Sequence, residues 1–173
     1  MTREKIILPL IRNKDVLDIG SVGEKSEYIF WNLLKRYAKQ LTGIDTRLSN
    51  DPAIVQGNME TYNFQKKFDI IVGGDVLIQT DNQGLFLDNI RKHLKNDGRL
   101  ILTMSNARWP SIFFRPSLFQ TGLHNKYTLK QILKNHRFKI ASLDYYYGNL
   151  HTLLPIRKTL FYRQALIVVC KKT

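Results

Sequence analysis

The sequence has a single cysteine and no cluster of residues that would bind a metal ion. With Cys170 alone among 173 residues, no disulfide can form within the chain, which suits a reducing compartment. Cys170 lies in the apolar segment 165–170, so we expect a buried strand residue rather than a nucleophile. No Cys/His group has the spacing of a metal site. The sequence therefore predicts neither a disulfide scaffold nor a metal centre.

Long apolar runs are also missing. No segment approaches the roughly 20 apolar residues that a membrane-spanning helix needs. The apolar run 6–11 stands between basic residues and is too short for a secretory signal. With the lone cysteine, these absences predict a cytoplasmic protein. A hydrophobic content of 43% over 173 residues excludes disorder and predicts a single domain spanning residues 1–173.

Acidic residues are scarce in the second half of the chain. Residues 1–86 hold 11 Lys and Arg against 11 Asp and Glu, whereas residues 87–173 hold 16 Lys and Arg against three Asp. The whole formal charge of +13 therefore lies in the second half. The simplest interpretation is a solvated basic face. The other is an anionic partner that contacts this half of the protein.

The spacing of apolar residues predicts alternating strands and helices. Strands are expected at 16–19, 41–45, 53–56, 68–73, 99–104, 138–146 and 164–171. Helices are expected at 25–38, 83–95 and 128–136, with Thr128 as the cap of the last one. Alternation of this kind predicts an α/β fold, in which helices cover both faces of a parallel sheet.

Residues 15–45 carry the strongest functional signal. An apolar run ends in Asp18, a turn with Gly20 and Gly23 follows, and then come a helical segment and a second short strand ending in Asp45. Strand–turn–helix–strand units of this type bind nucleotides. The glycines let the backbone approach a ligand, the helix start offers free N–H groups, and the second carboxylate can accept both hydroxyls of a ribose. The unit predicts an adenosine-type cofactor.

Two details favour S-adenosylmethionine over a dinucleotide. Asp18 stands two residues before Gly20, where its charge would repel a pyrophosphate and attract the ammonium group of a methionyl moiety. The turn also lacks the G-x-G-x-x-G pattern that places a pyrophosphate at a helix N-terminus.

Asp18-Ile19-Gly20 resembles the first motif of class I S-adenosylmethionine-dependent methyltransferases, and Gly43-Ile44-Asp45 resembles the second. The resemblance continues over almost the whole chain. Residues 56–60 are similar to the third motif, 68–76 to the fourth strand and its turn, and 94–102 to the turn entering the fifth strand. It implies a Rossmann-like, seven-stranded, mostly parallel sheet with helices on both faces and an antiparallel last strand.

The resemblance also implies a set of cofactor-binding residues. Asn58 and Met59 would frame the adenine, while Gly74 and Asp75 would flank the methionyl chain. The full expected set is Asp18, Gly20, Asp45, Asn58, Met59, Gly74 and Asp75.

The first turn departs from the family pattern D-x-G-x-G-x-G. Val22 takes the place of the second glycine, where its Cβ would crowd the methionyl moiety, and β-branched residues disfavour positive φ. Gln79 stands where many relatives have a histidine that would serve as a base. These changes raise the alternative of a catalytically silent cofactor-binding or scaffolding subunit. The retention of Asp18 and Asp45 argues against it.

Two segments lie outside the predicted core, at about 106–126 and 145–163. In open α/β sheets, ligands bind at the carboxyl ends of strands, so we expect these segments to form lids over an acceptor site. Their aromatic residues would otherwise form only a small satellite core. Arginines interleave these aromatics and suit a phosphate or carboxylate, because the planar guanidinium donates paired hydrogen bonds. They are Arg108, Arg115, Arg157 and Arg163.

Few residues are candidates for acid–base catalysis. His124 and His151 fall in the lid segments, although a lone loop histidine is more often structural than catalytic. Asp75 is a candidate for orienting the acceptor or for shaping the methionyl pocket. His93 and His136 are expected to be solvated. A methyl sulfonium is already activated, so alignment of the nucleophile and exclusion of water matter more than a base.

The sequence therefore predicts methyl transfer to a small or lipid-linked, anionic acceptor, with peripheral contact to an anionic membrane surface. The basic half also suggests RNA methylation as an alternative. The chain shows no appended RNA-binding module and no RNA-binding motif, which disfavours RNA as the acceptor. The sequence does not indicate an oligomeric state.

Overall fold

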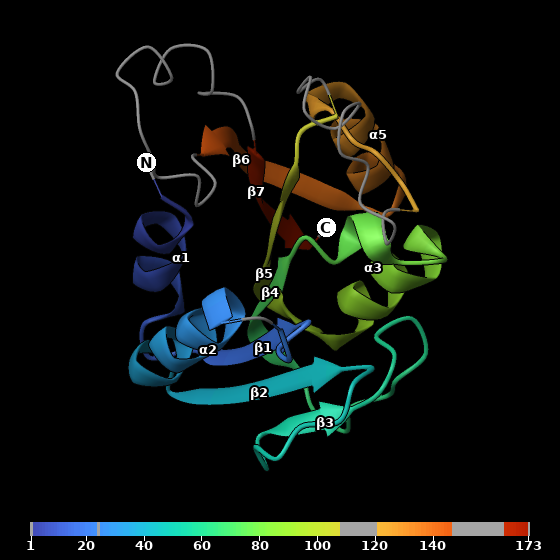
Figure 1. Ribbon diagram of the computed structural model, residues 1–173. Coiled ribbons are helices and arrows are strands. Elements are labelled where there is room, and N and C mark those ends of the chain that lie inside the picture. Colours follow the sequence, from blue (N-terminus) through green and yellow to red (C-terminus); the bar gives the residue numbers. More distant parts are fainter. Residues whose placement is uncertain (1, 24, 108–120, 147–164, 173) are drawn as a thin grey trace.

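The structure, a computed structural model, describes residues 2–23, 25–107, 121–146 and 165–172 (Figure 1). Its seven strands form one sheet in the order β3-β2-β1-β4-β5-β7-β6. Their bounds are β1 Asp15–Ile19, β2 Gln40–Asp45, β3 Ile54–Gln56, β4 Phe68–Gly74, β5 Leu94–Ser105, β6 Phe138–Tyr146 and β7 Ala165–Lys172. Strands β1 to β5 are parallel, and β7 runs antiparallel to both β5 and β6. The predicted Rossmann-like sheet is confirmed.

Helices cover both faces of this sheet (Figure 1). The helical elements are α1 Arg3–Ile11, α2 Lys25–Tyr37, η1 Leu77–Gln79, α3 Gln83–His93 and α5 Lys126–Asn135. Each face has its own apolar core. Ile7 and Leu34 from α1 and α2 pack on one face, whereas Phe86 and Leu129 from α3 and α5 pack on the other. The alternation of strands and helices in the sequence predicted this two-faced arrangement.

The first helix, α1, was not predicted. Its apolar residues are contiguous rather than spaced along one face, and Pro9 lies in its last turn, where it removes a backbone donor. Tertiary packing overrides this weak local preference, since Ile7 and Ile11 are fully buried against the sheet.

Helix α5 begins with a different cap from the one expected. Asn125 is the capping residue, because its Oδ1 accepts hydrogen bonds from the N–H groups of Tyr127 (2.8 Å) and Thr128 (3.1 Å). Thr128 stands three residues later and its Oγ1 accepts from the N–H of Asn125. The two residues form a reciprocal capping box. The prediction of Thr128 as the cap was wrong by one turn.

The histidines expected in solvent are engaged within the fold. His93 is buried, and its Nε2 accepts a hydrogen bond from the N–H of Phe64 at 3.0 Å. Its Nδ1 therefore carries the proton and donates to the carbonyl oxygen of Asn89 at 2.8 Å. His136 is half-buried and its Nδ1 lies 2.8 Å from Asp88. His93 therefore links the loop before β4 to α3 through its two hydrogen bonds.

The larger parts of both predicted lids, residues 108–120 and 147–164, lie outside the described residues. The expectations for His151 and for the four lid arginines Arg108, Arg115, Arg157 and Arg163 therefore remain predictions. Among the described helices, none combines the length and apolar character needed to cross a membrane.

Candidate functional site

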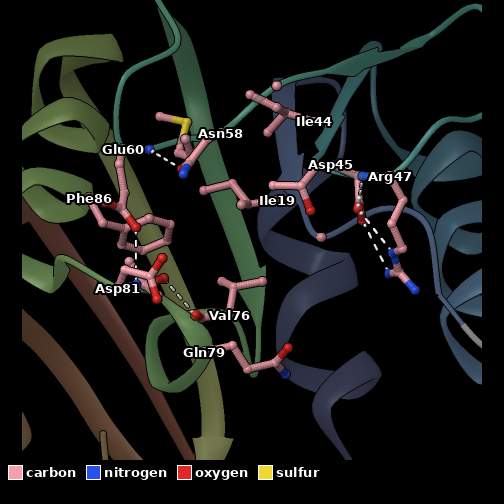
Figure 2. A pocket seen from close by; sticks show the side chains of 15 residues that line it. Ile19, Ile44, Asp45, Arg47, Asn58, Glu60, Val76, Gln79, Asp81 and Phe86 are labelled. Atoms are coloured by element: carbon pink, nitrogen blue, oxygen red, sulfur yellow. Dashed lines mark hydrogen bonds and ion pairs between the residues drawn. The ribbon is translucent and has the colours of Figure 1, made fainter. Parts of the chain in front are cut away.

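A cavity of about 580 Å³ opens at the carboxyl ends of the parallel strands (Figure 2). Its wall includes Gly20 after β1, Asp45 at the end of β2, Gly57 after β3 and Val76 after β4. Parallel strands present their carboxyl ends at one edge of the sheet, and the chain turns away there into helices or loops. This edge is where open α/β sheets bind ligands.

Gly20 lines this cavity directly after β1. Its φ is +80°, and a Cβ built on it would lie 2.6 Å from Cγ1 of Val76. Both facts require glycine, because an L side chain would be strained by the φ and would collide with Val76. The N–H of Gly20 donates to the carbonyl oxygen of Ile44 at 2.9 Å, which fixes the turn against β2.

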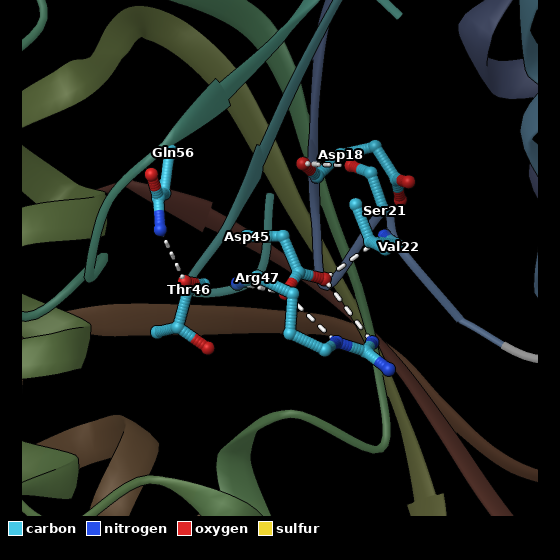
Figure 3. Close-up of polar contacts among 7 residues, drawn as sticks. All are labelled: Asp18, Ser21, Val22, Asp45, Thr46, Arg47 and Gln56. Atoms are coloured by element: carbon cyan, nitrogen blue, oxygen red, sulfur yellow. Dashed lines mark hydrogen bonds and ion pairs between the residues drawn. The ribbon is translucent and has the colours of Figure 1, made fainter. Parts of the chain in front are cut away.

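Asp45 holds a buried carboxylate at the end of β2 (Figure 3). Its Oδ2 accepts a hydrogen bond from the N–H of Val22, and its Oδ1 accepts one from the N–H of Arg47, both at 2.9 Å. The Arg47 guanidinium adds contacts of 3.2 Å from Nε to Oδ1 and 3.3 Å from Nη2 to Oδ2. These four contacts fix the orientation of the carboxylate.

Val22 does not strain the first turn. The positive φ of this turn belongs to Gly20, and Val22 has an ordinary backbone conformation. Its N–H group instead orients the carboxylate of Asp45. The expected conflict between a β-branched residue and positive φ was wrong, because the turn needs only one left-handed position.

The opposite wall is built by residues 57–60 and by the loop after β4. Met59 is buried, and its carbonyl oxygen accepts a hydrogen bond from Nδ2 of Asn89 at 2.8 Å. Oδ1 of Asn58 accepts a hydrogen bond from the N–H of Glu60 at 2.8 Å. Oε1 of Glu60 in turn accepts one from the N–H of Asp81 at 3.1 Å. Figure 2 shows both bonds of Glu60, and the one with Asp81 connects the two loops that face Asp45 across the cavity.

The cavity combines apolar walls with polar groups at its edges. Ile19 and Ile44 come from the ends of β1 and β2, and Val76 follows β4. Phe86 lies on the other side of the cavity (Figure 2), and Met59 also lines it. Flat heteroaromatic rings bind in such surroundings, where apolar side chains cover the ring faces and polar groups meet the ring edges. The size, the apolar walls and the single buried carboxylate together fit a nucleoside.

Gly74 and Asp75 stand just before Val76, beside the cavity wall. Asp75 has a φ of +55°, a conformation that aspartate tolerates better than most residues. Its N–H donates to the carbonyl oxygen of Thr103 at 2.8 Å, and its Oδ1 accepts from the N–H of Ser105 at 3.0 Å. Asp75 thus connects the ends of β4 and β5. These bonds agree with a shaping role for Asp75.

His124 is buried away from the cavity. Its Nε2 lies 3.0 Å from Oε1 of Gln83 at the start of α3, and burial lowers the pKa of the imidazole. It is not among the residues that line the cavity. No sequence signal distinguishes a loop histidine that is buried in this way from one that lines the cavity.

The structure brings some of the expected cofactor residues together on one cavity and places the others beside it. Gly20, Asp45, Asn58 and Met59 line the cavity. Asp18 is buried at the end of β1, and Gly74 and Asp75 follow β4, which pairs with β1. Sequence reasoning missed several further lining residues. They are Arg47, Gly57, Glu60, Asp81 and Phe86. Arg47 stands two residues after the second motif, and Gly57 and Glu60 lie within the third, so nearness to the motifs is the signal that would have found them.

Comparison with known families decides the assignment. A family profile described as a methyltransferase domain matches residues 3–149. The chain belongs to this methyltransferase family. The profile, the motifs and the fold agree in placing it among the class I S-adenosylmethionine-dependent methyltransferases. S-adenosylmethionine is therefore the cofactor that the family assignment indicates.

Solved structures of other methyltransferases share the fold. A methyltransferase from Archaeoglobus fulgidus superposes with a TM-score of 0.74 at 17% identity, covering 98% of this chain and 91% of that one. The N-methyltransferase NodS from Bradyrhizobium japonicum, in complex with S-adenosylhomocysteine, gives a TM-score of 0.69 at 16% identity, with 98% and 85% covered.

A third structure is the 1,6-didemethyltoxoflavin-N1-methyltransferase of Burkholderia thailandensis, with bound substrate and S-adenosylhomocysteine. It gives a TM-score of 0.66 at 16% identity, and the alignment covers 94% of this chain and 72% of that one. A search of curated protein sequences found no match.

Proposed function

We propose that this methyltransferase transfers the methyl group of S-adenosylmethionine to a small or lipid-linked acceptor with anionic character. The observation that carries the proposal is the buried carboxylate of Asp45, which faces the cavity opposite Asn58 and Met59 and next to the backbone of Gly20. A carboxylate at this place accepts hydrogen bonds from the hydroxyls of a ribose, and the glycine lets the protein backbone come close to the ligand.

The adenosine half of the cofactor would lie between the two walls of the cavity. Asp45 would accept hydrogen bonds from the ribose hydroxyls, in addition to those from the N–H groups of Val22 and Arg47. Asn58 and the backbone of Met59 would meet the polar edge of the adenine, and Ile44 would cover part of a ring face. The hydrogen bond from the N–H of Glu60 to Oδ1 of Asn58 keeps this side of the cavity in place before the ligand binds.

The cofactor supplies a methyl group already activated on a sulfonium, so the protein mainly orients the acceptor and excludes water. Gln79, which lines the cavity, is neutral, and His124 lies outside it. The described part of the site therefore favours an acceptor atom that is nucleophilic at neutral pH, such as a carboxylate or the unprotonated nitrogen of a heteroaromatic ring.

Cofactor choice is tested by calorimetry on the purified chain. We expect binding of S-adenosylmethionine and S-adenosylhomocysteine and no binding of NAD, because Asp18 would repel a pyrophosphate. Binding of NAD without binding of either sulfur nucleoside would overturn the proposal.

The acceptor class rests on the basic second half of the chain and on the small molecule, 1,6-didemethyltoxoflavin, that is bound in one of the structural neighbours. The test uses S-adenosylmethionine labelled in its methyl group, incubated with the protein and with separate small-molecule, lipid and RNA fractions. Label in the small-molecule or lipid fraction supports the proposal. Label in RNA alone would establish the RNA alternative, and the absence of label in every fraction would favour a silent binding subunit.

Contact with a membrane surface belongs to the same proposal. Basic residues near an anionic bilayer contribute about 1 kcal/mol each, and the second half carries an excess of 13 positive charges. Co-sedimentation with anionic vesicles but not with neutral ones is expected. RNA binding, if it occurs, should decrease steeply with salt concentration.

A further inference from the structure

A line of three cationic side chains crosses β5, β7 and β6, which are neighbours in the sheet (Figure 1). Arg99 of β5 is the direct partner of Lys171 of β7, and Lys171 is the direct partner of Lys139 of β6. Directly paired residues carry their side chains on the same face of a sheet, about 5 Å apart between neighbouring strands. We call Arg99, Lys139 and Lys171 the cation row.

The cation row continues an apolar line of the sheet. Val16 of β1 is paired with Ile70 of β4, and Ile70 is paired with Arg99. Val16 and Ile70 are buried in the core that α1 and α2 cover. The side chains change from apolar to cationic where this line reaches β5, and Lys139 and Lys171 are exposed. The cation row therefore lies at the amino edge of the sheet, where the apolar packing of this face ends.

The fold gains no stability from the cation row, because like charges directly opposite each other in a sheet are destabilising. Within the described part of the chain, none of its three side chains forms an ion pair, and neither does Asp97, which stands two residues before Arg99. The one acid of β6, Asp144, is paired with Ile167, four residues and thus about 13 Å along β7 from Lys171. A solvated face usually intersperses both signs of charge. The cation row instead suits an anionic partner.

Further cations approach the same end of β7 from the other face of the sheet. Lys172, the last residue of β7, is paired with Phe138, which is buried in the core of that face. Desolvation lowers the pKa of the Lys172 ammonium, and the nearby charges of Lys67 and Arg91 lower it further. The end of β7 therefore stands among cations on both faces of the sheet.

We propose that this edge binds a nucleic-acid strand through its phosphodiester backbone. A nucleic-acid strand carries its phosphates in a linear series, and a line of arginine and lysine side chains can contact several of them at once. Contacts to phosphate carry no sequence information, so binding is expected for any base sequence. Binding of this kind goes beyond the proposed function and does not make the nucleic acid the methyl acceptor, because the cavity opens at the opposite edge of the sheet.

An anionic bilayer fits this edge less well. Among the described residues, none of the exposed large apolar side chains belongs to β5, β6 or β7, whereas surfaces that lie in a bilayer interface combine basic with apolar side chains. The position of the cavity is a second argument. Val16, in line with the cation row, precedes Gly20 of the cavity by four residues, which is about 13 Å along a strand. A bilayer at the amino edge would hold the cavity away from a lipid-linked acceptor.

The test compares the cation row with a matched set of charges. The row variant is Arg99→Gln/Lys139→Gln/Lys171→Gln. The control variant is Lys5→Gln/Arg36→Gln/Lys130→Gln, which removes one exposed arginine and two exposed lysines from α2, α1 and α5. One probe is a fluorescent oligouridine of about 20 nucleotides, longer than the roughly 4–16 nucleotides that a small domain covers. The other is a vesicle of phosphatidylserine and phosphatidylcholine.

We expect the wild type to bind oligouridine, as measured by fluorescence anisotropy, with an affinity that decreases steeply with salt. The row variant should bind at least about tenfold more weakly, and its slope of log affinity against log salt should be smaller by about 2, since each phosphate contact contributes about 0.7. The control variant should stay within about threefold of the wild type, because salt screens charges distant from the strand.

Three results would overturn the proposal. The wild type does not bind oligouridine; both variants lose the same affinity, so that only net charge matters; or the row variant loses vesicle binding and keeps its affinity for oligouridine, which would make a membrane the partner.

Two further measurements separate this binding from a structural role and from the proposed function. In urea denaturation the row variant should be at least as stable as the wild type, because the substitutions remove like-charge repulsion. A marked loss of stability would assign the cation row a structural role and contradict the proposal. Affinity for S-adenosylhomocysteine should be equal in the wild type and the row variant. If neither protein binds S-adenosylhomocysteine while oligouridine binding depends on the cation row, the proposed function fails and the nucleic-acid site stands.

Discussion

The guanidinium of Arg47 covers the carboxylate of Asp45, with the 3.2 Å contact from Nε as the shortest of its two bonds. The side chain of Asp45 is 5% exposed and that of Arg47 is 61% exposed. Each oxygen of Asp45 also accepts one backbone N–H. A ribose that approaches Asp45 therefore meets the arginine side chain first. The N–H groups of Val22 and Arg47 can keep their hydrogen bonds to Asp45 when the guanidinium moves away.

The first prediction concerns this pair. Asp45→Ala should weaken binding of S-adenosylhomocysteine at least about tenfold, because hydrogen bonds to a charged group contribute roughly 1.5–3 kcal/mol. Arg47→Ala should leave the affinity within about threefold of the wild type, or raise it, because solvent around the exposed guanidinium reduces the ion pair to about 0–1 kcal/mol. The N–H groups of Val22 and Arg47 still hold the Asp45 carboxylate. Calorimetry on both variants, with circular dichroism to verify the fold, checks this. An unchanged affinity in Asp45→Ala would mean that the ribose is held elsewhere.

The second prediction compares two glycines at the same edge of the sheet. In Gly20→Ala, the new Cβ would stand 2.6 Å from Val76, in a backbone conformation that alanine disfavours. We expect a loss of about 1–3 kcal/mol in unfolding free energy and loss of cofactor binding. In Gly74→Ala the nearest atom would be at 3.5 Å, an ordinary contact, so stability should hardly change. Urea denaturation of both variants measures the difference, and equal losses would contradict it.

The sheet and the cavity at its carboxyl edge were predictable because their signals are local. Each of these signals occupies a few consecutive residues: the strand periodicity, the glycine turn and the acids at the strand ends. The fold brings the carboxyl ends of the strands to one edge of the sheet, as expected. Asp45 and Gly20 line one cavity for this reason. Elements whose structure depends on distant partners were not predictable. Helix α1 exists because Ile7 and Ile11 are buried on the sheet, and this burial outweighs the effect of Pro9.

The surroundings of two histidines also depend on segments that are distant in the sequence. His93 was expected in solvent from its place in the helix, yet it accepts the N–H of Phe64, which lies 29 residues away in the chain. His124 was a candidate base, yet it is buried against Gln83. In both cases the protonation and the partner are set by contacts between segments far apart in the sequence.

The third prediction concerns Cys170 in β7. The residue is fully buried, and burial raises the pKa of its thiol to about 12. Only a minute fraction is thiolate at pH 8, and the thiolate is the reactive form. A thiol reagent such as Ellman's reagent should therefore label the native protein only as fast as it unfolds, and the unfolded protein in urea within seconds to minutes. Fast labelling of the native protein without urea would contradict a buried β7.

The last prediction concerns Tyr146 at the end of β6. Burial raises the pKa of its hydroxyl from 10.0 to about 12, the charge of Asp75 adds to this, and the Thr103 hydroxyl partly opposes it. The fold therefore favours the neutral phenol. This contribution to stability is complete below pH 10 and decreases as the pH rises from about 10 to 12, because the unfolded chain releases the proton first.

At pH 11 the unfolded chain has lost most of this proton and the folded protein has kept it, which corresponds to about 1–1.5 kcal/mol. Tyr146→Phe removes the titrating group but keeps the ring. Between pH 9 and pH 11, the wild type should thus lose about 1–1.5 kcal/mol more unfolding free energy than the variant, measured by urea denaturation at each pH. Titration of lysines and of Cys170 affects both proteins equally and cancels in the comparison. Parallel losses in the two proteins would show that Tyr146 titrates as an exposed tyrosine and that the end of β6 is open to solvent.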